Sequence, residues 1–308
     1  MNLALCCISN ELAEQGVKFQ TMTYTRFSAL PYVQALETLS NRILNNFKVT
    51  HKTIKHCIAT GIKGYRLSSD ITPLLNHPSL RMTLDELPNF DAIADEIDSI
   101  SATIADNDIR ISAHPSEYIS LTSKEDRVIE NSILDLENHA MIFDLLGLPE
   151  DYRSPLNIHC RQDGNMEEVS SRFMLNFAKL SKGVRNRLVL ENNDNAKGVW
   201  SIKGLYNIFH NRYGFPITFD NLHHRILSGG LEEKEAFELA YSTWPTTPLF
   251  HFSEGIDGTR KHADYAVGLP NSYGKDVYWD CELKMKCWAI QDIIKRANST
   301  QRQILENK

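Results

Sequence analysis

Several features that would indicate a membrane protein or a disulfide-stapled secreted domain are missing from this sequence of 308 residues. No segment approaches the roughly 18 consecutive apolar residues that a membrane-spanning helix needs, so we expect no membrane partner. The six cysteines form no CxxC pair and no regular spacing, which is typical of reduced thiols in a cytoplasmic protein. The apolar start, MNLALCCIS, lacks the basic segment and the small-residue cleavage site of a signal peptide, and it indicates a first strand.

Phosphate-binding glycine motifs and an excess of positive charge are also absent. Neither GxGxxG nor GxxxxGK[ST] occurs, so the sequence predicts no nucleotide cofactor. The formal net charge is −6, which argues against a protein that coats nucleic acid along its whole surface. It leaves open an enzyme in which bound cations and a local group of basic side chains attract phosphate.

The sequence has instead a repeated alternation of short apolar runs and amphipathic segments. The runs are continuously apolar and rich in β-branched residues, as in strands that are buried on both faces of a parallel sheet. The eight runs are residues 2–9, 61–68, 108–115, 154–160, 187–192, 215–221, 248–254 and 275–282. Segments with helical periodicity lie between them, at residues 53–61, 84–107, 131–147, 169–183 and 231–244.

Eight strands that alternate with helices predict a single (β/α)₈ TIM barrel. We expect this barrel to span residues 1–308 as one domain, with 292–308 as a helical or frayed tail. A doubly wound open sheet is the main alternative, and the missing glycine motifs count against its nucleotide-binding forms.

Histidines and carboxylates gather at the carboxyl ends of the predicted strands. In a barrel these ends, and the loops after them, converge on one mouth where catalytic residues lie. One such residue alone is more often structural, but no local reason demands them after consecutive strands. Several carboxylates buried together also need a cation to compensate their charge. The residues at this level are His77, His114, His159, Glu191, Asp220, His223, His251, His262 and Glu282.

This set of donors predicts a metal cluster at the mouth. Imidazole and carboxylate ligands without a thiolate suit Mn²⁺, Zn²⁺, Fe²⁺ or Co²⁺ better than Ca²⁺ or a structural zinc site. The candidates are too many for one ion, so we expect two or three, the usual arrangement for phosphoester hydrolysis. Of the adjacent pair at 223–224 we expect only His223 to bind, because neighbouring side chains point apart in extended backbone. His56, His139 and His210 fall in helical segments and are expected to be surface or hydrogen-bonded core residues.

With these residues in place, the sequence resembles the ultraviolet damage endonuclease family, which is related to endonuclease IV and to barrels of the xylose isomerase type. The resemblance extends from the first strand to about residue 290. The segments that carry it are YRLSSDITPLLNHP, RISAHPSEYISL, LNIHC, LVLENND, ITFDNLHHR, LFHFSEG with KHADY, and DVYWDCELKMK. A sugar isomerase would share carboxylates and histidines but not this series of motifs.

The resemblance implies a DNA repair enzyme that cleaves the backbone immediately 5′ of ultraviolet photoproducts and leaves a 3′-hydroxyl. It implies a divalent-metal reaction, with Mn²⁺ expected first and Zn²⁺, Co²⁺ or Mg²⁺ as alternatives. The partner would be damaged double-stranded DNA, bound by a monomeric cytoplasmic protein associated with the nucleoid. All nine mouth residues match ligand positions of the family, and we expect catalytic roles for Glu191, Asp220 and Glu282.

The resemblance also indicates how a lesion would be recognised. Glu117 and Tyr118 match the pair of residues that probes the duplex by wedging into it, and Asn10 matches a position near the damaged nucleotides. A photoproduct weakens stacking, so extruding the damaged bases costs less than extruding normal ones. An aromatic ring such as that of Tyr118 can fill the gap and stack on the bases left behind.

The sequence departs from the family pattern at three places. Glu117 stands where the family usually has glutamine, and its carboxylate would be repelled by phosphate. Leu249 stands where relatives can carry a lysine, two residues before His251. The segment CRQDGN follows His159 in place of a glycine pair, and it contributes Arg161 as a candidate phosphate contact.

Basic residues directly after the predicted strands offer a path for the DNA backbone. We predict that they form a phosphate-binding track, which makes binding weaker as salt increases. These residues are Arg161, Arg225, Arg260 and Lys261, with Lys284 and Lys286. Two other enzyme classes fit the same barrel, a metal-dependent sugar isomerase or epimerase and an abasic-site endonuclease. A non-catalytic metal-binding barrel is a third alternative, which the number of ligand types disfavours.

Overall fold

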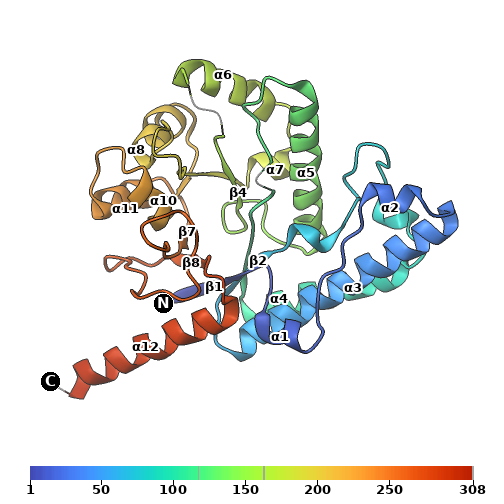
Figure 1. Ribbon diagram of the computed structural model, residues 1–308, viewed down its shortest axis with the longest axis horizontal. Coiled ribbons are helices and arrows are strands. Elements are labelled where there is room, and N and C mark those ends of the chain that lie inside the picture. Colours follow the sequence, from blue (N-terminus) through green and yellow to red (C-terminus); the bar gives the residue numbers. More distant parts are fainter. Residues whose placement is uncertain (117, 162–163, 307–308) are drawn as a thin grey trace.

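The computed structural model describes residues 1–116, 118–161 and 164–306, and its eight strands form one parallel sheet curved into a nearly closed barrel (Figure 1). Hydrogen-bonded neighbours follow the order β6-β5-β4-β3-β2-β1-β8-β7. The strands are β1 (Asn2–Cys6), β2 (Gly64–Leu67), β3 (Arg110–Ala113), β4 (Leu156–His159), β5 (Leu188–Glu191), β6 (Ile217–Thr218), β7 (Leu249–Phe252) and β8 (Tyr278–Cys281). Each lies inside one of the eight predicted runs, so the predicted TIM barrel is confirmed.

The two ends of the sheet meet just beyond β6. Asp220 forms an isolated parallel bridge with His251 of β7, and the His251 N–H donates to the Phe219 carbonyl at 2.9 Å. This contact brings the end of the sixth strand beside the seventh. The barrel is therefore closed at the level of two predicted metal ligands.

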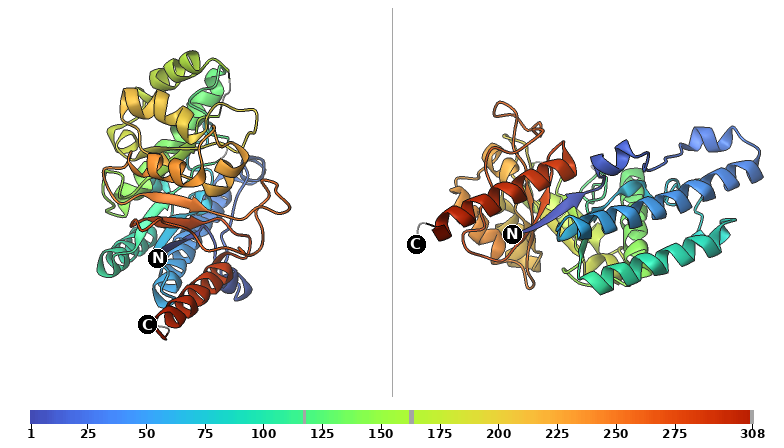
Figure 2. Two further views of the ribbon diagram at one scale, coloured as in Figure 1. Left: turned by 90° about the vertical axis from the view of Figure 1, so that its left-hand side faces the viewer. Right: turned by 90° about the horizontal axis from the view of Figure 1, so that it is seen from below.

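Helices surround the sheet (Figure 2). They are α1 (Asn10–Glu14), α2 (Tyr24–Ser28), α3 (Tyr32–Ala59), α4 (Phe90–Asn107), α5 (Asp126–Leu145), α6 (Met166–Phe177), α7 (Lys182–Arg185), α8 (Ile202–Leu205), α9 (Asn211–Tyr213), α10 (Asn221–Ile226), α11 (Glu233–Tyr241) and α12 (Lys286–Glu306). Two 3₁₀ turns, η1 (Ser69–Ile71) and η2 (Leu84–Glu86), and one π-helical turn, η3 (Tyr206–His210), complete the described helical elements. The alternation of strand and helix expected from the sequence is thus present.

The predicted helical segments 131–147 and 231–244 correspond to α5 and α11 with shifted ends, and the other three differ more. The predicted segment 53–61 is only the end of α3, a helix of 28 residues that packs side by side with α4 (Figure 2). The predicted segment 84–107 begins as η2, and α4 starts only at Phe90, because Pro88 disfavours helical backbone at the residue before it. The predicted segment 169–183 is two helices, since Ser181 caps the amino end of α7 by accepting from the Val184 N–H.

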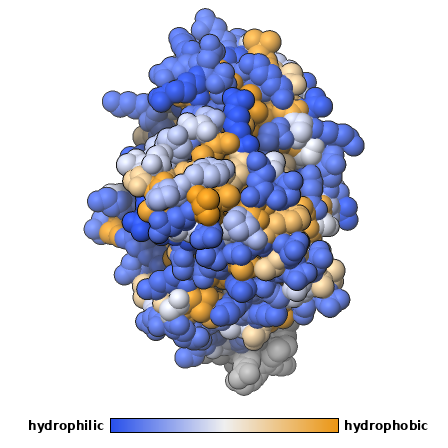
Figure 3. Space-filling model, turned by 90° about the vertical axis from the view of Figure 1, so that its right-hand side faces the viewer, coloured by the Kyte–Doolittle hydropathy of each residue, from blue (hydrophilic) through white to orange (hydrophobic). Residues whose placement is uncertain are grey.

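The last helix, α12, is anchored at its amino end. Cys287, Ile290 and Ile293 are fully buried in the hydrophobic core, and beyond them the helix runs away from the barrel (Figure 1). Among the described residues, none of the helices combines the length and the apolar character needed to cross a membrane. One face of the molecule, seen in Figure 3, is mostly hydrophilic with apolar side chains scattered across it.

The alternation of side chains along the strands decides what reaches the interior of the barrel. In β7 the ring of Phe250 points outward and packs against Phe237 of α11, with ring centroids 5.3 Å apart. In β8 the Trp279 ring does the same, 6.1 Å from Phe237. The residues that follow these aromatics, His251 in β7 and Asp280 in β8, therefore face inward, where both are fully buried.

The surroundings of Gly64 in β2 show how tightly neighbouring strands of the sheet are packed. A Cβ added there would lie 2.8 Å from the Ala4 Cβ and 3.2 Å from the Arg110 carbonyl oxygen, so both neighbouring strands would have to move. We expect Gly64→Ala to lower the free energy of unfolding by about 1–3 kcal/mol, as overpacking does, measured by urea denaturation. Gly268→Ala is the control, because nothing lies within 4 Å of its added Cβ. Equal stability of the two variants would contradict this account of the packing.

Candidate metal centre

Glu191, the last residue of β5, lies at the centre of four histidines. Its Oε2 is 3.0 Å from His114 Nε2 and 3.7 Å from His159 Nε2. Its Oε1 is 3.1 Å from His223 Nδ1 and 3.2 Å from His251 Nδ1. Glu191 is only 1% exposed, so one buried carboxylate is shared by imidazoles from several separate elements.

A second group adjoins the first through His251. Its Nδ1 is 3.3 Å from Glu282 Oε1 and 4.0 Å from Asp220 Oδ2. His262, on the loop after β7, reaches the same carboxylate, with its Nε2 3.7 Å from Glu282 Oε2. Three sets of candidate ligand atoms result, each with its atoms within 4.8 Å of one another: His114, Glu191 and His251; His159, Glu191 and His223; Asp220, His251 and Glu282.

The turn after β6 explains how Asp220 and His223 come together. Asp220 is the N-cap of α10, and its side chain accepts a hydrogen bond from the His223 N–H at 2.8 Å. Its own N–H donates to the side chain of Asn192 at 2.8 Å. His223 is three residues into this helical turn and faces the mouth, whereas the His224 ring packs on Phe219 with centroids 5.7 Å apart. The two histidines point apart because this segment is helical, not because it is extended.

An inner polar layer lies below these residues, and sequence reasoning missed it. Asn157 donates a hydrogen bond to Glu191 Oε2. Ser112 donates to Asp280 Oδ2 at 3.3 Å. The Arg66 guanidinium contacts Glu282 and lies 3.8 Å from Asp280 Oδ2.

The spacing of residues within the strands could have indicated this layer. Ser112, Asn157 and Asp280 each stand two positions before a predicted ligand, so strand alternation turns them toward the same interior. Leu249 occupies the equivalent position in β7, is 2% exposed and brings no polar donor to this layer.

The ionisation of the cluster follows from burial and close charges. Burial lowers the pKa of His251, but the carboxylates of Glu191 and Glu282 outweigh it and raise the pKa to about 9. Burial likewise opposes the charge on His223, yet Asp220 and Glu191 raise its pKa well above the usual range. The pKa of Glu191 lies well below its usual range, because nearby histidines outweigh the effect of burial. The protons on His251 and His223 therefore compensate the charge of the carboxylates in the absence of a metal ion.

Unsatisfied atoms in the cluster match the donors that a divalent ion takes. Among the residues that the structure describes, His159 Nδ1 and Asp220 Oδ2 are buried and make no hydrogen bond, an arrangement that is costly unless something binds them. Imidazole nitrogens and carboxylate oxygens suit first-row divalent ions. The residues present thus fit the metal cluster that the sequence predicts.

His77, by contrast, does not join the described clusters. Its ring stacks on Tyr24 with centroids 4.4 Å apart, and its Nδ1 accepts from the Ser79 N–H at 3.2 Å. It lines a cavity of about 290 Å³ together with Tyr118. His77 lies ten residues beyond the end of β2. The loop places its imidazole beside Tyr118 and not beside Glu191.

The predicted lesion contacts have different surroundings. Tyr118 follows β3 and is 82% exposed, as a residue that inserts into a duplex would be. Asn10 begins α1, and its Nδ2 is 3.5 Å from the Lys284 carbonyl oxygen. Glu117 lies outside the described residues.

The predicted phosphate-binding residues are exposed or half-buried around the loops after the strands. Arg225 is engaged by Glu254 and Glu233, at 3.4 and 3.6 Å. Arg260 lies 3.4 Å from Asp194. Arg161, Lys261 and Lys284 are exposed and Lys286 is half-buried. These carboxylate partners reduce the positive charge that Arg225 and Arg260 present to a phosphate.

The family UV-endonuclease UvdE matches residues 1–305 of the chain. The chain belongs to this family. The resemblance that the mouth motifs indicate is therefore confirmed, and the family match covers all eight strands of the barrel.

Individual UvdE-family relatives are similar over most of their length. A UV DNA damage endonuclease from Nostoc sp. is 30% identical over 300 residues, which cover 94% of this chain and 88% of that protein. A UV DNA damage endonuclease from Bacillus cereus is 30% identical over 254 residues, covering 80% and 76%. The crystal structure of SacUVDE aligns with a TM-score of 0.82 and 28% identity over 98% of this chain and 99% of that one. Endonuclease IV from Thermus thermophilus shares the fold, with a TM-score of 0.56 and 14% identity over 81% and 94%.

Protons and metal ions would compete for the same ring nitrogens at the mouth of this UvdE-family barrel. His251 and His223 carry protons in the metal-free site, and an imidazolium cannot ligate a cation. We therefore expect Mn²⁺ binding to release protons near neutral pH and to strengthen as pH rises toward the pKa of His251, about 9. Calorimetry in two buffers of different ionisation enthalpy measures the protons released.

His224→Gln is the matched control for this measurement. Burial lowers the pKa of His224, so this ring carries no proton to release, and its loss should leave the proton count unchanged. Metal affinity that does not vary with pH would contradict the assignment of protons to His251 and His223.

Proposed function

We propose that the protein is a metal-dependent DNA repair endonuclease that hydrolyses the phosphodiester bond immediately 5′ of an ultraviolet photoproduct in duplex DNA. The observation that carries the proposal is the buried Glu191, which four histidines surround at the mouth of the barrel. Membership of the UvdE family, and relatives named UV DNA damage endonucleases, support damaged DNA as the substrate.

Two or three divalent cations, Mn²⁺ first among them, would be held at the mouth by the three ligand sets. Glu191 and His251 each belong to two of these sets, so adjacent ions would share ligands. When bound, such ions supply Lewis acidity toward phosphate oxygens and acidify water at neutral pH. His262 is the most exposed of the clustered histidines, with 30% of its side chain accessible, so it is the one that a phosphate from solvent would reach first.

Residues of the inner layer orient the ligands and do not contact the substrate. The Asn157 amide holds Glu191 Oε2, which fixes the direction of the carboxylate. Arg66 contacts Glu282 and places a permanent positive charge beside it. Such supporting hydrogen bonds keep ligand geometry fixed while a substrate binds.

Lesion recognition is assigned to the exposed ring of Tyr118, with Asn10 and Glu117 as further contacts. Tyr118 follows β3 on the side of the barrel where the strands end, as His114 does. A flat exposed aromatic ring can stack on bases without reading their sequence. It would therefore suit a site that selects a distorted duplex and not a particular base.

The charge of Glu191 is the first target for mutagenesis. Glu191→Gln keeps the size of the side chain but removes the charge that four histidines share, so we expect nicking to fall by more than about 100-fold. The assay uses a duplex with one defined photodimer and an undamaged duplex, both with Mn²⁺ present. Glu238→Gln, an exposed carboxylate of α11 paired with Lys234, should nick like the parent.

Circular dichroism must show that the Glu191→Gln variant is folded. Mapping both ends of the product checks the cleavage position, since a cut 5′ of the dimer leaves a 3′-hydroxyl that a polymerase extends. A folded parent protein that left the damaged duplex intact with Mn²⁺ present would exclude the proposed activity. Product ends on the 3′ side alone would exclude the proposed cleavage position.

Tyr118 is expected to affect recognition and not metal binding. Tyr118→Ala should weaken binding to the damaged duplex by about 5- to 150-fold, equivalent to the ~1–3 kcal/mol of one stacked base. Tyr118→Phe should retain most of the affinity, because it keeps the ring. Titration of a labelled duplex measures the affinity, and Mn²⁺ binding is measured separately.

Tyr213→Ala is the matched control for Tyr118→Ala. Tyr213 is also an exposed tyrosine, but it precedes β6 and so lies at the opposite end of the barrel. Equal losses in the two alanine variants would show that Tyr118 is not a specific contact with the lesion.

A further inference from the structure

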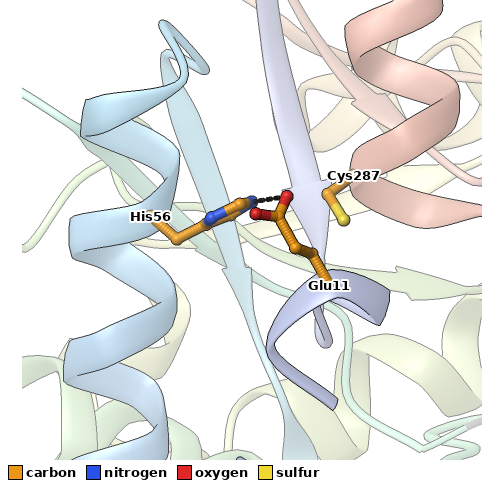
Figure 4. A group of neighbouring side chains, drawn as sticks. All are labelled: Glu11, His56 and Cys287. Carbon is orange, nitrogen blue, oxygen red and sulfur yellow. Dashed lines mark ion pairs between the residues drawn. The ribbon is translucent and has the colours of Figure 1, made fainter. Parts of the chain in front are cut away.

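A second group of metal-ligating side chains lies outside the mouth of the barrel. Glu11 of α1, His56 of α3 and Cys287 of α12 point toward one another (Figure 4). One ligand atom from each lies within 4.8 Å of the other two, and Glu11 Oε2 is 3.9 Å from His56 Nε2. None of the three belongs to the ligand sets around Glu191.

The imidazole of His56 has an unmet requirement at this place. Its Nε2 is buried and makes no hydrogen bond within the described part of the chain, and only 9% of the side chain is exposed. The sequence predicts a surface or hydrogen-bonded core histidine here, and the structure corrects that prediction. A buried polar atom without a partner is costly, and this one is aimed at a carboxylate and a thiol.

We propose that Glu11, His56 and Cys287 bind one divalent cation of the Zn²⁺ class. Sulfur, imidazole nitrogen and carboxylate oxygen are the three donor types that zinc takes in proteins. The thiol distinguishes this group from the mouth, whose described ligands are imidazoles and carboxylates that suit Mn²⁺ as well.

The surroundings of the three side chains are those of a ligand site. Cys287 is fully buried, and the Ser9 hydroxyl donates a hydrogen bond to its Sγ at 3.2 Å, which orients the sulfur and stabilises a thiolate. Glu11 is 43% exposed at its side chain, so an ion can enter from solvent on that side. A water molecule can complete a tetrahedral site there.

The proposed ion would connect three helices that are distant in the sequence. Because these donors meet only in the folded chain, binding favours the folded state. The helices held together are α1, which follows β1, α3, which precedes β2, and α12, which follows β8. The ion would thus fasten the amino end of α12 to the barrel.

Cobalt substitution tests the proposal, because a thiolate bound to Co²⁺ gives an intense charge-transfer band in the near ultraviolet that nitrogen and oxygen ligands do not. We expect titration of the metal-free protein with Co²⁺ to produce this band, and its final intensity to correspond to one Co²⁺–thiolate bond per chain. Cys287→Ser should abolish the band, and His56→Gln should weaken Co²⁺ affinity at this site by at least tenfold. Cys281→Ala, which removes another buried thiol, should leave the band intact, as should Glu191→Gln.

Melting temperatures measured in the Glu191→Gln background test the proposed site separately from metal binding at the mouth. Zn²⁺ should raise the melting temperature of the Glu191→Gln variant by more than that of Glu191→Gln combined with Cys287→Ser. Absence of the cobalt band in the parent protein, or its persistence in folded Cys287→Ser, would overturn the proposal. If Cys287→Ser did not fold, an unchanged band and unchanged affinity in His56→Gln would overturn it equally.

Discussion

The buried charge of Glu191 is the constraint on which the mouth of the barrel depends. A carboxylate that is 1% exposed is tolerated only when charges or hydrogen bonds compensate it. Here compensation comes from His114 after β3, His159 in β4, His223 in α10 and His251 in β7. These elements lie around the circumference of the barrel, so the compensation exists only when the sheet has closed in the correct register. Folding and assembly of the site are therefore one event.

The negative charge at the mouth is neutralised partly by the guanidinium of Arg66, which is permanent, and partly by protons on histidines, which a metal ion can replace. Arg66 is a permanent cation beside Glu282 and Asp280. The charge of Glu191 is balanced by protons, which His251 retains because carboxylates outweigh burial and raise its pKa to about 9. A ring nitrogen that loses its proton becomes able to ligate a cation. The same imidazoles can thus stabilise the folded chain without metal and bind metal when it is available.

The sequence predicts the barrel well because burial of both strand faces leaves a local pattern, a continuous apolar run. It predicts that the histidines and carboxylates of the mouth converge for the same reason, since barrel geometry brings the strand ends together. Asn157 and Arg66 leave no such pattern, because a polar residue inside an apolar run becomes meaningful only when the sheet is known to close around it. The position of His77, ten residues past β2, does not determine where its loop points, and in this structure its ring stacks on Tyr24. Glu11, His56 and Cys287 lie on three helices, and only tertiary packing brings them together.

The two groups of candidate ligands are connected through β1 and β8. These strands pair in parallel register, with Leu5 opposite Cys281, and Glu282 follows directly on the second of them. Glu11 and Cys287 lie a few residues beyond the ends of the same two strands, and the Asn10 side chain reaches the Lys284 carbonyl between them. A contact that holds α1 against α12 therefore also restrains the backbone that carries Glu282 into the mouth. Holding α1 against α12 outside the sheet limits the movement of Glu282 inside it. The rigidity of the mouth therefore depends also on residues that do not line it.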